Sequence, residues 1–300
     1  MRTLLRVSPR RLLTLALLPV AALVCASHAN AQATFEKIAA RQQINVGYRE
    51  DSAPFSYASR EKKPVGYSID ICEAVAARLA TRLGQKNLRI NFVPIAVDRV
   101  ITFVKNGSVD ILCANTTDTA ERRDQVAFSR PIYIDQVGVM VRKKDGIAKL
   151  DQLAGRQLVA IRSTTAVSAV ETYGREKSLA WKVEGALNPD AALSQLQLGW
   201  AQGYARDRVQ LAMQLADVKD ADQYAILPDA LSSEPIALAF RKDDAAMLEL
   251  VNGVIADAGA SGQAATWYDK WFVRPIPLGK ANKALGIPMS AELKAALAAR

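Results

Sequence analysis

The stretch from Asn115 to Ser129, which reads NTTDTAERRDQVAFS, combines residue types that could bind an anion. It follows an apolar run, residues 109–114, whose composition predicts a buried strand. Asp118 stands three residues before Glu121, the spacing of a capping box, so we expect a helix to begin here with Arg122 in its first turn. Hydroxyls, free backbone N–H groups and a guanidinium at the end of a strand can together receive a carboxylate. The alternative is a plain helix cap with a solvated arginine.

The longer segment NTTDTAERRDQVAFSRPIY resembles the α-carboxylate site of bacterial family-3 solute-binding proteins, the periplasmic receptors of polar amino acid ABC transporters. Gly66, Tyr67 and Asp70 also match the GY/GF-x-x-D element of that family. The resemblance covers nearly the whole chain after residue 31. It implies an α/β, two-lobe periplasmic-binding-protein fold of type II, whose parallel-rich sheets are joined by a two-strand hinge. It further implies a monomer that binds an amino acid, needs no cofactor, and delivers the ligand to inner-membrane permease subunits.

Residues 1–31 predict a cleavable export signal. Its basic start contains Arg2, Arg6, Arg10 and Arg11, residues 12–24 are apolar, and Ala29-Asn30-Ala31 is an A-x-A cleavage site. The apolar run is too short to span a bilayer as a stable helix, and no later run is long enough, so we expect a soluble periplasmic protein. Cys25 suggests a lipid anchor as the alternative, but Val24 occupies a position where that signal needs a small residue.

Cleavage would change the charge and the chemistry that remain. It removes four arginines and no acidic residue, which lowers the formal net charge from +9 to +5. The remaining positive charge is dispersed, without a long Lys/Arg run or interleaved aromatics, and this argues against nucleic-acid binding. His28, the only histidine, is lost as well, which excludes histidine catalysis and histidine metal sites; we expect no metal.

Two cysteines, Cys72 and Cys113, remain after cleavage. The periplasm permits a disulfide, and the helix expected to carry Cys72 should cover the sheet that contains Cys113. We therefore expect a bridge between them, with two buried free thiols as the alternative.

Alternating strand and helix signals predict two lobes. Strands are expected at residues 44–48, 89–94 and 109–114, with helices between them, which indicates a parallel sheet. Extended runs at 131–141 and 235–242 are the expected crossings between lobes. The expected division is 34–131 and 237–275 for the first lobe, 132–236 for an inserted second lobe, and 276–300 for a tail packed on the first.

Four turns are expected to meet in the cleft between these lobes. An amino acid zwitterion needs a guanidinium and N–H donors for its carboxylate, a carboxylate for its ammonium group, and an apolar wall. By resemblance, Arg122 binds the α-carboxylate and Asp207 the ammonium group, within an A-Y-x-x-D pattern whose alanine is Gly203 here. The expected ligand-binding residues are Arg49, Phe55, Tyr57, Asn115, Thr117, Arg122, Ser163, Thr164 and Asp207.

Arg49 bears on the choice of ligand. The Gly-x-Arg-Glu pattern that contains it resembles glutamate/aspartate-binding receptors, in which this arginine meets the side-chain carboxylate. Three positions depart from those receptors: Val100 replaces a second arginine, Pro189 replaces a histidine, and Asn115 replaces a serine in the turn. The resemblance therefore implies a polar, acidic ligand, with an amide or another polar amino acid as the alternative.

Competing interpretations come from two other classes of protein. A periplasmic cyclohexadienyl dehydratase-like enzyme on the same scaffold would need a cleft carboxylic acid with a raised pKa, for which Glu184 and Asp207 are candidates. A kinase sensor domain would need a transmembrane segment and a signalling domain. Simpler roles are also open: Arg206 and Arg208 could neutralise Asp207, and Phe55 and Tyr57 could be core residues. We expect a transport protein without catalytic residues.

Overall fold

The computed structural model describes residues 34–278 and 281–298, so the predicted export signal lies outside the described residues. Residues 34–41 are helical. The first large sheet contains, in spatial order, β5 (Arg89–Pro94), β1 (Gln43–Tyr48), β6 (Ile111–Leu112), β14 (Ala239–Arg241) and β7 (Val126–Phe128). β1 is parallel to β5 and β6, which confirms the predicted parallel strands, and β14 runs antiparallel to β6 and β7.

Helices cover both faces of this sheet. They are α2 (Tyr67–Arg82), α3 (Val100–Lys105), α8 (Ala245–Ser261) and α9 (Gln263–Tyr268). Ile111 packs in the core that includes α2 and α8, whereas the next residue, Leu112, packs in the core that includes α3. This alternation follows from the strand geometry, in which successive side chains point to opposite faces.

The second large sheet contains, in order, β10 (Lys182–Ala186), β9 (Gln157–Ile161), β11 (Gly203–Asp207), β8 (Tyr133–Arg142) and β12 (Tyr224–Ile226), and β13 (Ser232–Ile236) also pairs with β8. Its helices are α5 (Thr165–Glu176), α6 (Pro189–Leu198) and α7 (Arg208–Asp217). Short 3₁₀ turns occur at Val97–Arg99, Lys143–Asp145, Leu150–Leu153 and Ala221–Gln223, and a π-helical turn at Asp269–Val273.

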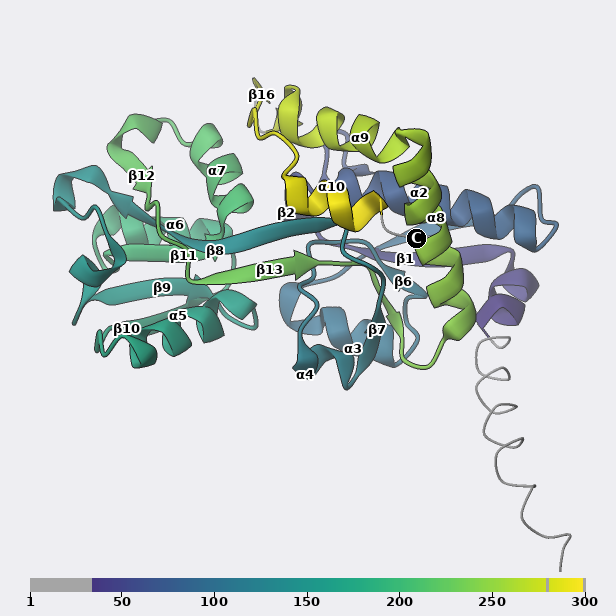
Figure 1. The fold of residues 1–300 in the computed structure, drawn as a ribbon, viewed down its shortest axis with the longest axis horizontal. Coiled ribbons are helices and arrows are strands. Elements are labelled where there is room, and N and C mark those ends of the chain that lie inside the picture. The colour runs from purple at the N-terminus through teal and green to yellow at the C-terminus, as the bar shows by residue number, and fades with distance from the viewer. Residues whose placement is uncertain (1–33, 279–280, 299–300) are drawn as a thin grey trace, which may run out of the picture.

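Two strands connect the two sheets, as Figure 1 shows for β8 and β13. The chain leaves the first sheet after β7, enters the second through β8, and returns through β13 to β14. The predicted lobe boundaries, at 131/132 and 236/237, fall within these two passages. Two paired strands give a connection about which the lobes can rotate.

A small sheet that the sequence did not indicate lies beside the end of β1. Its strands are β2 (Asp51–Ser52), β3 (Ser56–Ala58) and β4 (Pro64–Val65). Gly66, with φ +141°, follows β4 where a Cβ atom would clash with the backbone oxygen of Phe55. This close approach requires glycine and carries the chain directly from the small sheet into α2.

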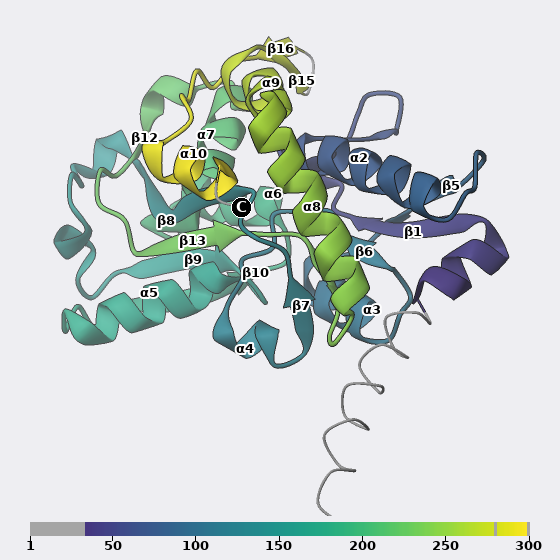
Figure 2. The same ribbon diagram turned by 45° about the vertical axis from the view of Figure 1, so that its right-hand side comes forward.

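The C-terminal segment packs on the first lobe. It forms β15 (Ile276–Leu278), β16 (Ala281–Lys283) and α10 (Ala291–Ala298). Leu293 and Leu297 are buried in the core that contains α2 and α8, and Ile287 N donates to Phe272 O at 3.0 Å. Figure 2 shows α10 beside α8. These contacts support the predicted packing of the tail.

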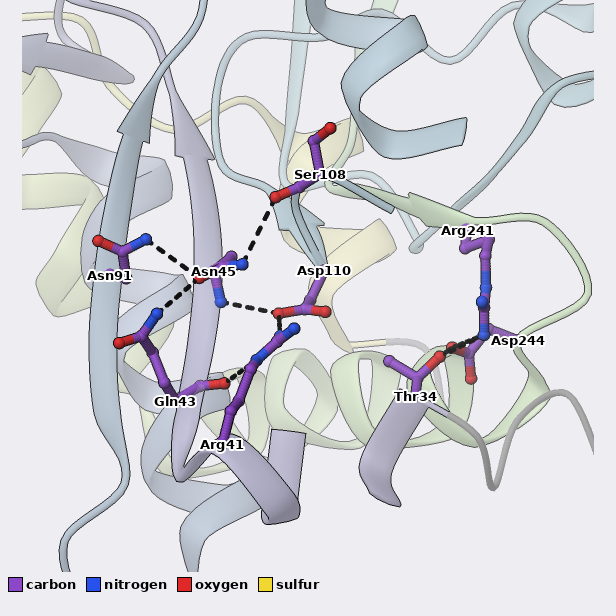
Figure 3. Close-up of polar contacts among 9 residues, drawn as sticks. All are labelled: Thr34, Arg41, Gln43, Asn45, Asn91, Ser108, Asp110, Arg241 and Asp244. Carbon is purple, nitrogen blue, oxygen red and sulfur yellow. Dashed lines mark hydrogen bonds and ion pairs between the residues drawn. The ribbon is translucent and has the colours of Figure 1, made fainter. Parts of the chain in front are cut away.

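A polar network occupies the amino end of the first sheet (Figure 3). Asp110 accepts a hydrogen bond from the backbone N of Asn45 at 2.7 Å and pairs with Arg41. The Asn45 side-chain oxygen accepts hydrogen bonds from Gln43 and Asn91, each at 3.0 Å. Burial raises the pKa of Asp110. The network therefore fixes the strand starts, at the end of β1 opposite to Arg49.

The predicted disulfide between Cys72 and Cys113 is confirmed. Cys72 lies on α2, Cys113 directly follows β6, and their Cα atoms are 6.4 Å apart. Among the described residues, no helix is long and apolar enough to cross a membrane.

We expect the Cys72→Ala/Cys113→Ala variant to unfold at lower urea concentration than the wild type. The bridge joins residues 41 positions apart. Closing a loop of this size lowers the conformational entropy of the unfolded chain, which stabilises the folded protein by about 4 kcal/mol. Urea unfolding followed by circular dichroism measures the difference. Reductant should then shift the wild-type midpoint toward that of the variant and leave the variant unchanged; equal midpoints for the two oxidised proteins would contradict the prediction.

Candidate functional site

A cavity lies between the two sheets, at the carboxyl ends of β1, β6, β9 and β11. In doubly wound α/β sheets, this edge is where ligands bind. The cavity holds about 560 Å³ of space not filled by protein atoms, its mouth included. Six of the predicted ligand-binding residues line it: Arg49, Asn115, Thr117, Arg122, Thr164 and Asp207.

Arg122 supplies a positive charge to the first-lobe wall. It lies on α4 (Ala120–Arg123), and its Nη1 donates to the backbone oxygen of Thr117 at 2.9 Å. Burial lowers the pKa of Arg122, while Glu234 and Asp207 act in the opposite direction. The guanidinium is thus desolvated and held against the turn that follows β6, where a ligand carboxylate could pair with it.

The predicted cap of this helix is wrong by one residue. Thr119, not Asp118, is the N-cap, and its side-chain oxygen accepts from the backbone N of Arg122 at 3.2 Å. Asp118 instead accepts two hydrogen bonds from Arg123, each at 2.5 Å. The ion pair between Asp118 and Arg123 leaves the Arg122 side chain to turn toward the cavity.

Asp207 supplies the negative charge from the second lobe. It ends β11, is 7% exposed, and accepts a hydrogen bond from Asn115 Nδ2 at 2.9 Å. Burial raises the pKa of Asp207 to about 6, against the opposing effects of Asn115, Arg206 and Arg122. This value lies below 7, so the carboxylate form predominates at neutral pH. A buried carboxylate at this point can accept an ammonium group.

The amino terminus of α5 adds further donors. Thr164 is the N-cap residue, but its hydroxyl donates to Ile161 O at 2.6 Å and accepts no hydrogen bond from the first turn of the helix. Thr164, Thr165 and Ala166 line the cavity, and Thr165 Oγ1 lies 3.4 Å from Thr117 Oγ1 of the first lobe. Uncapped N–H groups at a helix start favour an anion.

Arg49 is positioned by the small sheet. Its backbone N donates to Ser56 Oγ at 2.8 Å, and Ser56 Oγ donates to Arg49 O at 2.9 Å. Its Nη2 donates to Asp51 Oδ1 at 2.6 Å. The side chain is buried and lines the cavity. The cavity wall therefore contains two guanidinium groups, those of Arg49 and Arg122.

Three predicted ligand-binding residues do not line the cavity. Phe55 is fully buried against Tyr133 and Phe272, and Tyr57 donates through its hydroxyl to Pro277 O at 3.2 Å. Phe55 lies in the turn between β2 and β3, and Tyr57 lies on β3; both rings pack in the first-lobe core. Ser163 is exposed in the left-handed region, with φ 62°. The apolar part of the cavity comes instead from Val97, Val100 and Ile161.

Arg206 and Gln210 line the cavity, and the sequence did not assign them a ligand-binding role. Arg206 Nε donates to Gln210 Oε1 at 3.0 Å, and Arg206 Nη2 donates to Asp51 O of the first lobe at 3.2 Å. The sequence offered one signal, the position of Arg206 directly before Asp207. Gln210 could not be selected from the sequence, because its position near the cavity depends on α7 beginning directly after β11.

Two α/β lobes joined by two strands, with a charged cavity between them, define a type II periplasmic binding protein, as the sequence predicted. The chain belongs to the bacterial extracellular solute-binding proteins, family 3, whose sequence profile matches residues 44–274. Members of this family are periplasmic binding proteins that bind amino acids and work with ABC permeases.

The similar proteins are named after different amino acids. The chain is 32% identical to the glutamate/aspartate import solute-binding protein of Salmonella typhimurium over 265 residues, 88% of this chain and 87% of the relative. An ancestral arginine-binding protein bound to arginine superposes with a TM-score of 0.68 at 26% identity, covering 77% of this chain and 98% of that one. The ancestral amino acid-binding protein AncCDT-1, a precursor of cyclohexadienyl dehydratase, gives 0.66 at 25% identity, covering 79% and 98%.

Proposed function

We propose that this protein is the periplasmic solute-binding component of an ABC transporter for an acidic amino acid, glutamate or aspartate. Residues 1–31 would direct its export and then be removed. The lobes would close on the ligand about β8 and β13, and the closed form would deliver it to the membrane permease. Lobe closure is supported by contacts across the cleft, among them Asn115 to Asp207 and Arg206 to Asp51.

The observation that carries this proposal is the arrangement of charge in the cavity. Arg122 and Asp207 approach from opposite lobes and offer partners for the α-carboxylate and the ammonium group, which every amino acid has. The lining also contains Arg49, whose guanidinium pairs with Asp51 through Nη2 and is not required by these two groups. An acidic side chain would supply the matching carboxylate. The name of the Salmonella relative is consistent with this choice of ligand.

Calorimetric titration of the purified protein with glutamate, aspartate, glutamine and arginine tests the proposal. We expect glutamate or aspartate to bind most tightly, because a cationic side chain would meet Arg49 and an amide would form weaker hydrogen bonds with it. A preference for glutamine or arginine would contradict the proposed ligand.

Arg49→Gln should weaken the binding of acidic ligands far more than that of glutamine. Arg49 is buried, so removing its charge should cost a bound side-chain carboxylate roughly 30-fold or more in affinity. Glutamine, which has no second carboxylate, should change by only a few-fold. Titration of both ligands with the variant measures the difference, and equal losses would show that Arg49 does not select the side chain.

The dehydratase alternative has weaker support in this cavity. Glu184 is exposed on β10 and does not line the cavity, so it is not the proton donor that the sequence allowed. Asp207 does line it, and its pKa of about 6 is the feature that favours an enzyme. A general acid must carry its proton before the reaction, whereas Asp207 is mostly ionised at pH 7. An ionised Asp207 fits the role of an ammonium acceptor.

A further inference from the structure

Arg206 is a buried arginine without a carboxylate partner among its hydrogen bonds. It is 7% exposed, and its three nitrogen atoms donate to neutral oxygens: Gln210 Oε1 at 3.0 Å, Gln214 Oε1 at 3.2 Å and Asp51 O at 3.2 Å. A guanidinium has five N–H donors. Beyond these three hydrogen bonds Arg206 also acts on the Tyr204 hydroxyl, which leaves at least one donor. Its hydrogen bonds are therefore to neutral groups, although its charge also favours the ionised form of the neighbouring Asp207, and its remaining donor capacity can meet an anion.

Arg206 and Arg49 converge on one residue from opposite lobes. Asp51 receives Arg206 at its backbone oxygen and Arg49 at its carboxylate, at 3.2 and 2.6 Å. Both arginines line the same cavity. Closure of the lobes thus brings a second-lobe guanidinium to the part of the first lobe that already contains Arg49.

Gln210 adds an unused donor at this place. Its Oε1 is occupied by Arg206, while its Nε2 is buried without a hydrogen-bond partner. Gln210 also lines the cavity and is 4% exposed. A buried donor without an acceptor is costly, and a carboxylate oxygen of a ligand would satisfy it.

From these observations we infer that Arg206 is a specificity-determining residue that binds the side-chain carboxylate of an acidic amino acid together with Arg49. This inference rests on the proposed function and adds the second lobe to the recognition of the side chain. In the lining of the cavity, Arg49, Arg122 and Arg206 face a single carboxylate, that of Asp207. Arg49 pairs with Asp51, and Arg122 is influenced by the buried Glu234. Arg206 therefore supplies further positive charge beside Arg49 for the additional carboxylate of glutamate or aspartate.

A structural role for Arg206 makes a different prediction. Its hydrogen bond to Asp51 O joins the two lobes, so Arg206 could act only as a clamp that favours closure. Loss of a clamp would weaken all ligands by the same factor, because every ligand binds the closed form. Loss of a specificity-determining residue would weaken the acidic ligands selectively. The ratio of the dissociation constants for glutamine and glutamate separates these two roles.

The test compares wild type, Arg206→Gln, Arg206→Lys and Arg208→Gln by calorimetric titration with glutamate, aspartate and glutamine. Arg208→Gln is the matched control, because it removes the same charge two residues away from a side chain that donates to the carbonyls of Leu227 and Asp229 and does not line the cavity. Thermal unfolding of each protein, without ligand, verifies that the variants are folded.

We expect Arg206→Gln to reduce the preference for glutamate or aspartate over glutamine by roughly 30-fold, the loss typical of a buried charge partner. Arg206→Lys should keep part of the preference, because it keeps the charge but loses the planar fork. Arg208→Gln should keep all of it.

Three outcomes would overturn the inference. An acidic preference in the wild type that survives in Arg206→Gln overturns the inference and leaves the proposed function standing. Equal losses for all ligands make Arg206 a clamp only, with the same consequence. A wild type that prefers glutamine or arginine overturns the proposed ligand class and this inference together.

Discussion

Arg122→Ala should strongly weaken the binding of every amino acid, acidic or neutral. The α-carboxylate is common to all of them, and Arg122 is the buried guanidinium beside the turn after β6. Removing one member of a desolvated charge pair costs about 2–5 kcal/mol, which is roughly 30- to several-thousand-fold in affinity. Calorimetry with glutamate, aspartate and glutamine measures the loss, which should be similar for all three.

Arg123→Ala is the matched control for this prediction. Arg123 lies next to Arg122 on the same short helix, but its side chain is 67% exposed and pairs with Asp118. Its replacement should leave all three affinities nearly unchanged. If Arg122→Ala still binds tightly, the α-carboxylate site lies elsewhere and the role assigned to Arg122 by resemblance is wrong.

Asp207→Asn should cause a loss of similar size and should also remove the acid sensitivity of binding. In the wild type, the pKa of Asp207 is raised by burial to about 6, so the carboxylate is protonated as the pH falls through this value. A protonated Asp207 cannot pair with an ammonium group, and affinity should fall by about tenfold for each pH unit well below 6. Between pH 6.5 and 8 affinity should change little. Titrations from pH 4.5 to 8 measure the profile.

A neighbouring carboxylate provides the control for the acid sensitivity. Asp135, on β8, also has a raised pKa, caused first by burial and then by the negative charge of Asp207. It does not line the cavity. Asp135→Asn should therefore keep the loss of affinity at low pH, and Asp207→Asn should give a flat profile. A flat profile in Asp135→Asn alone would assign the titration to the hinge strand instead.

Local sequence patterns correctly predicted those strands and helices whose formation depends mainly on neighbouring residues. The apolar run at residues 44–48 forms β1 in the interior of the sheet, because continuous apolar sequence suits a strand buried on both faces. Residues 89–94 form the edge strand β5, in which Ile90 and Phe92 alternate with the exposed Arg89 and Asn91. Edge strand β10 was missed because Lys182–Ala186 contains charged and small residues without a clear apolar pattern. Helix α7 was missed because the charges at residues 206–208 resemble a loop.

The candidate site likewise contains some residues that the sequence could predict and others that it could not. The chain order of the turns, together with the family resemblance, was enough to select six residues that line the cavity. Each lies at a strand end, in the turn that follows one or, for Arg122, on the short helix after such a turn, and parallel strands bring these ends to one edge. The six are Arg49, Asn115, Thr117, Arg122, Thr164 and Asp207. By contrast, the directions of Phe55 and Tyr57 depend on the pairing of β2, β3 and β4. That pairing joins residues through hydrogen bonds that no local pattern specifies.

The sequence by itself determined the fold class and the family, and it predicted Arg122 and Asp207 as the anchors for the two charged groups of an amino acid. Only the tertiary structure decided which side chains surround the rest of the ligand. Arg206 reaches the cavity because β11 lies between β9 and β8, and because the two lobes meet at Asp51, 155 residues earlier in the chain. Contacts across such separations depend on how the lobes pack, and packing is a property of the whole core rather than of any segment.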